Sequence, residues 1–375
     1  MGKFKYLILG SGVGEAIAYL LLQFKDTLVV NLTDEDGTKA RNIAVRLSKL
    51  TGRCCTSREF HAETDMDSLG CHMYDVIISA LPAKFSPQLA KLAIKNKVSF
   101  CDLGGVMEVT TQIFKLNVGP DCNFSIVSDC GLMPGLGMML CASIVNDFNC
   151  TDSISILVGG IPQRPQPPID YQRVYSVEGM KHLCYDEAPI LSDGQIIEVA
   201  PFSNYEKLVV PELANYVNKT GEIETFMTAG TARAPWSFRA RGVKNFSEKT
   251  VRWPGFMDFV KDIPREKFEE VITPLISIPV DAVNPDMVWM RVTGTGQKNG
   301  QPAEHSYTLV DKFDEKTGLS AMKRTTGFAT AILAHMMAQG RVLRGINTSE
   351  SCLDPDHLKQ YIKELMLYLP GLKEN

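Results

Sequence analysis

The 375-residue sequence has no run of about 18 consecutive apolar residues, so it contains no ordinary transmembrane helix. Its first residues lack the apolar core and the small-residue cleavage site of a signal peptide. It also lacks a strong excess of either charge, because 39 Lys and Arg stand against 43 Asp and Glu. We therefore expect a cytoplasmic protein that binds neither nucleic acid nor a membrane.

Paired cysteine motifs are also absent. The sequence contains 10 cysteines, but none of them form a C-x-x-C pair. This spacing argues against a zinc site and against a disulfide framework. We therefore expect no bound metal, and most of the cysteines should be buried thiols in a reducing compartment.

The length suits about two domains. In the first 150 residues, apolar strand patterns alternate with helical patterns, and the run at 74–81 is apolar enough for a strand covered on both faces. This alternation predicts an α/β fold with a Rossmann-type doubly wound parallel sheet. The predicted strands are 5–9, 27–33, 74–81, 98–103 and 124–129, and the predicted helices are 15–24, 38–51, 86–96 and 107–116.

After residue 150 the pattern changes to strands separated by proline-rich loops. This predicts a second α+β domain, 151–321, with a mixed, mostly antiparallel sheet that serves substrate binding and dimerisation. We expect the apolar helices 325–338 and 355–369 to pack back on the first domain, which would comprise 1–150 and 322–375. Predicted strands of the second domain are 153–159, 195–199, 222–228, 287–294 and 305–312.

A glycine-rich turn follows the first predicted strand and opens the first helix. In a G-x-G-x-x-G fingerprint, the glycines allow a tight turn, the approach of a pyrophosphate and close packing of helix on strand. The sequence has Gly10, Gly12 and Gly14, with Val13 between the last two. It matches the fingerprint only if one loop residue is deleted, because Glu15 stands at the position of the third glycine. We favour the deletion, with Gly14 in the third role.

Asp34 ends the second strand about 20 residues after this turn. A carboxylate there accepts hydrogen bonds from the adenosine ribose and repels a 2′-phosphate. Glu35 and Asp36 follow it and no Arg or Lys does, so the sequence favours NAD as the cofactor. The segment predicted to lie at the nicotinamide half is Ser79, Ala80, Leu81 and Pro82.

Asp102 and Asp129 each come with glycines at the end of a predicted strand, where ligands bind in open α/β sheets. Together with later motifs, they give the sequence a resemblance to the saccharopine dehydrogenase superfamily, closest to its lysine 6-dehydrogenase branch. The motifs that carry this resemblance are V-G-G-I-P-x-R-P-x-P-P from Val158, Tyr171, Ser176-Val177-Glu178-Gly179, Glu224-x-Phe226-x-Thr228, Lys249-Thr250-Val251-Arg252-Trp253-Pro254-Gly255 and Arg324-Thr325-Thr326.

The resemblance implies oxidation of the ε-amine of L-lysine by NAD, with cyclisation of the semialdehyde and release of ammonia. Such a site must hold a carboxylate, a task for arginine, and must deprotonate an amine whose ordinary pKa is about 10.4. We assign Arg252, then Arg164, to the carboxylate. Candidates for amine binding or the base are Glu178, Asp102 and Asp129, and Thr228 and Tyr175 would supply neutral hydrogen bonds.

Alternatives remain for these assignments. Val106 and Phe256 stand where the branch has histidines, and the stretch Thr228-Ala229-Gly230-Thr231 is shorter than in the branch. The alternative enzymes are saccharopine and carboxynorspermidine dehydrogenase, and the alternative of another class is a non-catalytic NAD-binding scaffold. A homodimer is expected from the large apolar helices near the end of the sequence. Structural alternatives also exist for single residues: a surface Arg252 stacked on Trp253, turn-capping roles for Asp102 and Asp129, and a solvated Glu178 at a helix start.

Overall fold

The computed structural model describes residues 3–216 and 220–375, which divide into two compact units. Unit 1 comprises Met1–Met139 and Lys323–Tyr368, and unit 2 comprises Leu140–Met322 and Leu369–Asn375. The predicted bounds differ from this division in three places, one of which is the single residue Met322, which belongs to unit 2. Residues 140–150 and 369–375 belong to unit 2, because the last strand pairs inside its sheet and Ser143 hydrogen-bonds to Tyr307.

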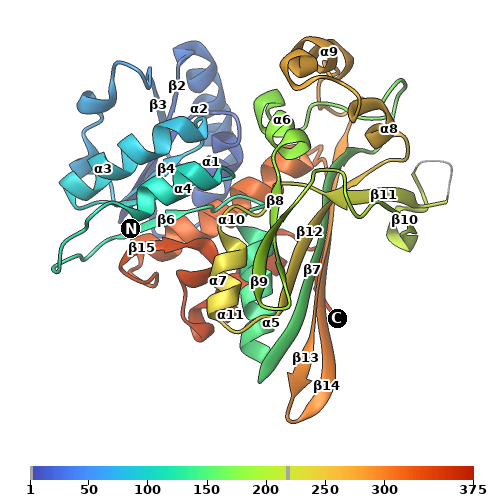
Figure 1. Ribbon diagram of the computed structural model, residues 1–375. Helices are drawn as coiled ribbons and strands as arrows, with labels where there is room; N and C mark the ends of the chain where they lie inside the picture. The colour runs from blue at the N-terminus through green and yellow to red at the C-terminus, as the bar shows by residue number, and fades with distance from the viewer. Residues whose placement is uncertain (1–2, 217–219) are drawn as a thin grey trace. The chain divides into compact units, whose positions relative to one another are not determined.

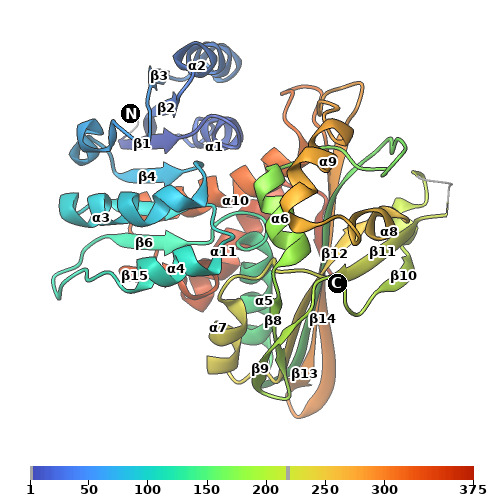
Figure 2. The same cartoon turned by 45° about the horizontal axis from the view of Figure 1, so that its top comes forward.

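Unit 1 is built on a parallel sheet of seven strands in the order β15-β6-β5-β4-β1-β2-β3. In Figure 2, the arrows of β1, β4 and β6 point in the same direction. The order reverses between β1 and β4, and ligands of such sheets bind at this switch point. The predicted doubly wound sheet is therefore confirmed. Its strands are β1 (Phe4–Leu9), β2 (Thr27–Asp34), β3 (Cys55–Glu59), β4 (Val76–Ser79), β5 (Ser99–Asp102), β6 (Ser125–Ser128) and β15 (Gly345–Thr348).

Helices connect these strands, and their apolar faces bury the sheet. Much of the core consists of aliphatic side chains of the central strands, such as Leu7, Ile77 and Ile126, packed on Leu89 and Ala90 of a helix. Burial of these side chains supplies the main driving force for this unit. The helices are α1 (Gly14–Leu21), α2 (Gly37–Thr51), α3 (Ser86–Asn96), α4 (Met107–Phe114), α10 (Ala321–Ala338), nearly all of it in unit 1, and α11 (Pro355–Tyr368).

Unit 2 contains a nine-stranded sheet whose main path is β10-β11-β12-β7-β13-β14-β16. Only β12 and β7 pair in parallel along it, so the predicted mixed, mostly antiparallel sheet is confirmed. Its strands are β7 (Cys150–Pro162), β8 (Ala188–Ser192), β9 (Gln195–Val199), β10 (Glu206–Val209), β11 (Glu222–Met227), β12 (Asn245–Arg252), β13 (Asp286–Lys298), β14 (Gln301–Lys312) and β16 (Leu372–Glu374).

Three helices of unit 2, α6, α8 and α9, lie at the end of this sheet that is away from the β13–β14 turn (Figures 1 and 2). They enclose a second core, in which Tyr171 and Phe256 pack with Met180 and Phe268. The helices of this unit are α5 (Leu136–Asp147), most of which lies in it, α6 (Val177–Tyr185), α7 (Ala234–Ala240), α8 (Phe256–Val260) and α9 (Phe268–Leu275).

Several strands were not predicted: β3, β8, β10, β12, β15 and β16. Each is short or rich in polar residues; β12 reads Asn-Phe-Ser-Glu-Lys-Thr-Val-Arg. All 10 cysteines are free, and six of them are buried, as expected for packed thiols. Within 3–216 and 220–375, no helix has the length and apolar character needed to cross a membrane.

Candidate functional site

The glycine turn after β1 has the backbone of a tight nucleotide-binding loop. Gly10 adopts a φ of +92°, and a Cβ there would lie 2.7 Å from the Ala80 carbonyl oxygen. Both the conformation and the close approach of the next strand require glycine. The chain then passes Ser11, Gly12 and Val13 and enters α1 at Gly14.

Gly14 and Gly12 have different surroundings. A Cβ on Gly14 would lie 2.8 Å from Ile8 Cγ2 and 3.3 Å from Leu32 Cδ1, so this glycine lets α1 pack closely on the sheet. A Cβ on Gly12 would meet no atom within 4 Å, and Gly12 is exposed. Gly14 therefore fills the role of the third glycine, and Gly12 leaves open space beside backbone N–H groups at a helix start.

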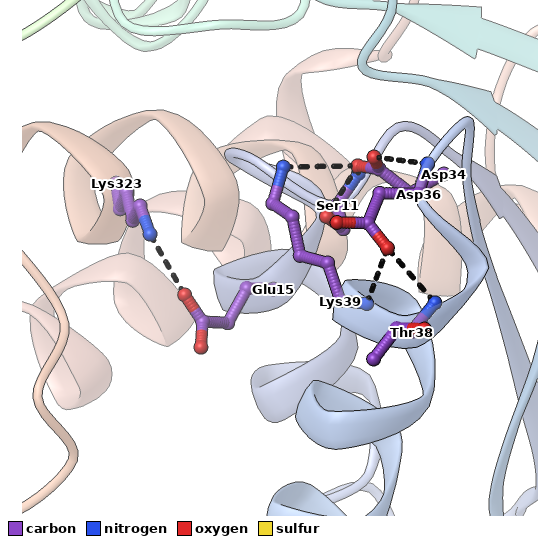
Figure 3. Close-up of polar contacts among 7 residues, drawn as sticks. All are labelled: Ser11, Glu15, Asp34, Asp36, Thr38, Lys39 and Lys323. Atoms are coloured by element: carbon purple, nitrogen blue, oxygen red, sulfur yellow. Dashed lines mark hydrogen bonds and ion pairs between the residues drawn. The ribbon is translucent and has the colours of Figure 1, made fainter.

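Asp34, at the end of β2, is fixed against this turn (Figure 3). Its carboxylate accepts hydrogen bonds from the Ser11 N–H at 2.9 Å, from the Ser11 hydroxyl, and from the Asp36 N–H at 3.2 Å. Lys39 Nζ lies 3.2 Å from the same carboxylate. Burial alone would raise the pKa of Asp34, but these hydrogen bonds hold the pKa below its ordinary value. Asp34 is therefore an ionised acceptor beside the turn.

Glu15 joins three helices of unit 1. Its carboxylate pairs with Arg46 of α2 and with Lys323 of α10, the latter at 2.8 Å (Figure 3). Glu15 is buried, whereas the two cationic side chains are partly exposed. The residue at the expected third glycine position therefore has a structural ion-pair role.

The segment after β4 lies at the same edge of the sheet as the turn. Ser79 pairs with Leu9 on one side and with Asp102 on the other. The Ala80 N–H donates to the Leu9 carbonyl at 2.7 Å, and the Leu81 side chain would contact a Cβ on Gly10 at 3.3 Å. The carboxyl ends of the strands near the switch point therefore carry the predicted residues: Ser79 ends β4 and is followed by Ala80, Leu81 and Pro82, and Asp102 ends β5.

Asp102 and Asp129 hold the turns beside them. The Asp129 N–H donates to Asp102 Oδ1 at 3.1 Å, while Asp129 accepts hydrogen bonds from the Gly105 N–H and the Thr110 hydroxyl. Full burial raises the pKa of Asp102, and burial together with the Asp102 charge raises the pKa of Asp129 to about 8. These contacts match the turn-capping interpretation.

Arg252 is the main cation buried in the sheet of unit 2 and is 3% exposed. Its guanidinium lies 4.8 Å from the centre of the Tyr171 ring and 5.2 Å from that of Phe256, so the interpretation as a surface arginine stacked on Trp253 is wrong. Nη2 donates to the Tyr175 hydroxyl at 3.1 Å, and Nη1 to the Val251 carbonyl at 2.8 Å.

The Arg252 Nε is buried and makes no hydrogen bond to any residue that the structure describes. No carboxylate within the described ranges forms an ion pair with this guanidinium either. A buried guanidinium stays charged and is costly to leave without an anion. Its environment therefore suits an incoming carboxylate.

Polar side chains continue along the same face of the sheet. Residues 248, 250 and 252 of β12 alternate toward one side, and Thr228 follows β11 beside them. The Thr228 hydroxyl lies 2.8 Å from the Thr250 hydroxyl and donates to Glu248 Oε2 at 3.2 Å. Glu248 is 2% exposed, and burial raises its pKa to about 8. The sequence analysis did not single out Glu248.

Two candidates lie apart from Arg252 within unit 2. Arg164 is exposed, and its Nη1 donates to the Val283 carbonyl at 3.0 Å. Glu178 is exposed in the first turn of α6, where the Ser176 side chain caps the helix. The structure thus brings Arg252, Tyr175, Thr228 and Glu248 to one region and leaves Arg164 and Glu178 at the surface.

The residues present fit a dinucleotide better than a metal. Unit 1 combines an open position at Gly12, a helix N-terminus and an ionised acceptor at Asp34, which are the features that bind a pyrophosphate and a ribose. Across 3–216 and 220–375, no three side chains of His, Cys, Asp or Glu come together to hold a metal ion.

Comparison with known proteins gives the same family for both ends of the chain. Residues 6–120 match the saccharopine dehydrogenase NADP binding domain, and residues 278–368 match the saccharopine dehydrogenase C-terminal domain. A curated relative, the mitochondrial alpha-aminoadipic semialdehyde synthase of Rattus norvegicus, is 23% identical over 215 residues, which are 56% of this chain. The match spans about a quarter of that relative's length (23%).

Among solved structures, the chain is similar to apo saccharopine dehydrogenase (L-Glu forming) from Saccharomyces cerevisiae. The TM-score is 0.76 at 16% identity, and the alignment covers 100% of this chain and 99% of the yeast chain. At this identity the likeness establishes the fold.

Proposed function

Since the chain carries two domains of the saccharopine dehydrogenase family, we propose that it is an amino-acid dehydrogenase that oxidises the ε-amine of L-lysine with NAD. The products are the cyclic imine of the semialdehyde and ammonia. The observation that carries this proposal is Arg252 on the sheet of unit 2, a buried guanidinium whose Nε–H makes no hydrogen bond to any described residue. Such a group recognises the carboxylate of a small amino acid.

NAD is proposed over NADP because of Asp34. Its ionised carboxylate ends β2 and is followed by Glu35 and Asp36, a negative environment for a 2′-phosphate. The cation paired with this carboxylate is Lys39, whose Nζ lies 3.2 Å from Asp34 Oδ2. When bound, the nicotinamide supplies the hydride acceptor.

The chain's own residues bind and deprotonate the substrate. Arg252 lies beside the Tyr171 and Phe256 rings, which contact each other, and donates to Tyr175. It can therefore fix the carboxylate without losing an ion pair to any residue that the structure describes. The ε-ammonium must lose a proton before a hydride can leave its carbon, because only the neutral amine has a lone pair to donate. The resulting imine takes up water and releases ammonia, and the aldehyde condenses with the α-amine.

Saccharopine is the alternative substrate, and the likeness to the yeast enzyme favours it. It carries further carboxylates and would need a second cation near Arg252. Arg164 was the candidate for this role, but it is exposed and bonded to the Val283 carbonyl. The buried acid Glu248, four residues before Arg252 on the same strand face, also disfavours another carboxylate there.

The proposal is tested by measuring NADH and NADPH formation with L-lysine and with saccharopine in parallel. Lysine oxidation with NAD, with one ammonia per NADH, supports it. Turnover of saccharopine alone would replace it by the alternative enzyme. Cofactor binding without amine-dependent reduction of either nucleotide would favour a non-catalytic NAD-binding scaffold.

A further inference from the structure

A carboxyl group and a guanidinium are buried on one face of the unit 2 sheet without pairing with each other. Glu248 and Arg252 stand four residues apart on β12, which places their Cα atoms about 13 Å apart. Both side chains are at least nine-tenths buried, and no ion pair joins them among the residues that the structure describes. The Arg252 charge still acts on Glu248, since it favours the ionised carboxylate electrostatically.

The immediate partners of Glu248 are neutral. The Thr228 hydroxyl donates to its Oε2 at 3.2 Å and lies 2.8 Å from the Thr250 hydroxyl. A Cβ on Gly230 would lie 2.8 Å from Oε2 of Glu248, so the close approach of the carboxyl group to this backbone position requires a glycine. Hydroxyls offset part of the desolvation of a carboxylate but do not neutralise it.

Another buried acid on this face shows what a structural carboxylate looks like here. Glu224 of β11 stands opposite Arg252 in the register and accepts hydrogen bonds from the Gly255 N–H at 3.0 Å and from the Met257 N–H at 2.6 Å. These backbone bonds anchor the segment that leads into α8. Among the described residues, Glu248 receives no such backbone N–H bond, so its burial has no comparable structural purpose.

We infer that Glu248 receives the distal ammonium of the substrate, so that Arg252 and Glu248 together select an amino acid that carries a second amine. The separation fits this class of molecule: six bonds of about 1.5 Å join the carboxyl carbon of lysine to its terminal nitrogen, roughly 7 Å when extended. A hydrogen bond of about 3 Å at each end of the molecule accounts for the rest of the distance. Thr228 positions the Glu248 carboxylate through its hydroxyl group.

This inference rests on the proposed function, because it takes the Arg252 ligand to be an amino-acid carboxylate. It also gives the deprotonation step an acceptor. The ammonium of the substrate transfers one proton to the Glu248 carboxylate, which leaves a neutral amine and a neutral carboxylic acid. Burial favours this neutral pair over the charged pair.

The test measures discrimination between ligands in the full chain and in variants. The probes are L-lysine, L-norleucine, which lacks the distal amine, and 6-aminohexanoate, which lacks the α-amine. Dissociation constants are measured by calorimetry, and NADH formation from lysine is followed in the same preparations. Glu248→Gln removes the charge and keeps an acceptor for Thr228, and Glu248→Asp keeps the charge. Glu224→Gln is the matched control, because it neutralises the other acid of this face.

We expect the wild-type chain to prefer lysine over norleucine by about 10- to 100-fold, the usual range for one hydrogen bond to a buried charge. Glu248→Gln should reduce this preference to less than about threefold. Glu248→Asp should restore most of it, and Glu224→Gln should lower the melting temperature but keep the preference. The preference for lysine over 6-aminohexanoate should survive in all variants.

If Glu248→Gln keeps the full preference for lysine over norleucine, the inference is overturned. It is also overturned if this variant loses only the preference for lysine over 6-aminohexanoate. If wild type oxidises lysine and Glu248→Gln discriminates as wild type does, the proposed function stands and the inference fails. If Glu248-dependent lysine binding occurs without NADH formation, the inference stands and the proposed reaction fails. Absence of lysine binding by the wild type overturns both.

Discussion

The glycine turn allows binding and stability to be separated with two single substitutions. Gly12 is exposed, its φ lies outside the left-handed region, and a Cβ there would touch nothing within 4 Å. Gly12→Ala should therefore change the free energy of unfolding by less than about 1 kcal/mol, in the stabilising direction. The added methyl group occupies the open side of the turn, where a pyrophosphate would approach. We expect the dissociation constant for NAD to rise at least about tenfold, which corresponds to about 1.4 kcal/mol.

Gly14→Ala should instead lower the stability of the folded chain. Its Cβ would lie 2.8 Å from Ile8 Cγ2, well inside the contact distance of about 3.5–4.0 Å between carbon atoms. Overpacking of this kind costs about 1–3 kcal/mol, and the better helix propensity of alanine returns up to about 1 kcal/mol. For a unit of roughly 185 residues, a net loss of about 1–2 kcal/mol, the middle of this range, lowers the melting temperature by about 2–8 °C.

Both variants are assayed by thermal unfolding without nucleotide and by calorimetric titration with NAD. We expect Gly12→Ala to lose affinity for NAD at an unchanged melting temperature, and Gly14→Ala to have a lower melting temperature. If Gly12→Ala binds NAD as tightly as wild type, the open side of the turn does not face a pyrophosphate. If Gly14→Ala is fully stable, Gly14 does not fill the role of the third glycine.

Three further predictions concern single carboxylates or cations. Asp34→Ser should raise KM for NAD at least about tenfold and narrow the preference for NAD over NADP, because the ribose acceptor is lost and Lys39 is released; equal effects on both nucleotides in initial-rate assays would contradict this. Arg252→Lys should raise KM for lysine at least about tenfold while KM for NAD stays unchanged, because a lysine lacks the planar fork; an unchanged KM for lysine would remove Arg252 from the site. Asp129→Asn should weaken the pH dependence of stability. The folded chain binds more protons than the unfolded chain between the ordinary carboxyl pKa of about 3.9 and the raised pKa of about 8, so wild-type stability falls as pH rises through that window. Urea unfolding at pH 6 and pH 8.5 measures this slope, and equal slopes in wild type and variant would refute it.

Local patterns were sufficient to predict most of unit 1, but not its edge strands β3 and β15. The glycine turn, the apolar run that became β4 and the helical periodicity of α3 each depend on neighbours in the sequence. Asp34 and the role of Gly14 follow from the same short βαβ segment. The long helix α10 was also predicted, because its apolar character is continuous over several turns.

The sheet of unit 2 was harder to predict, because its burial depends on distant pairings. Strand β12 has polar residues at six of its eight positions, as a solvent-facing edge strand would, yet it lies inside the sheet between β11 and β7. Glu248 therefore looked like a surface residue in the sequence. A buried carboxylate is found only after the partners of the strand are known, although the four-residue spacing from Arg252 was a visible signal.

The same limit applies to Arg164 and Glu178. Both were chosen through motifs that the resemblance highlights, and both side chains are exposed. Motif membership indicates which segment is important, whereas the direction of each side chain depends on local backbone geometry. Tyr175, from the neighbouring motif, does contact Arg252.

The central claim is that this chain oxidises the terminal amine of L-lysine with NAD, and one measurement tests it most directly. Purified full-length protein is mixed with L-lysine and NAD, and NADH, ammonia and the cyclic imine are quantified in the same reaction. The account predicts equal amounts of all three products, and a much slower reaction with NADP. NADH formation from saccharopine but not from lysine, or no NADH from either substrate, would contradict it.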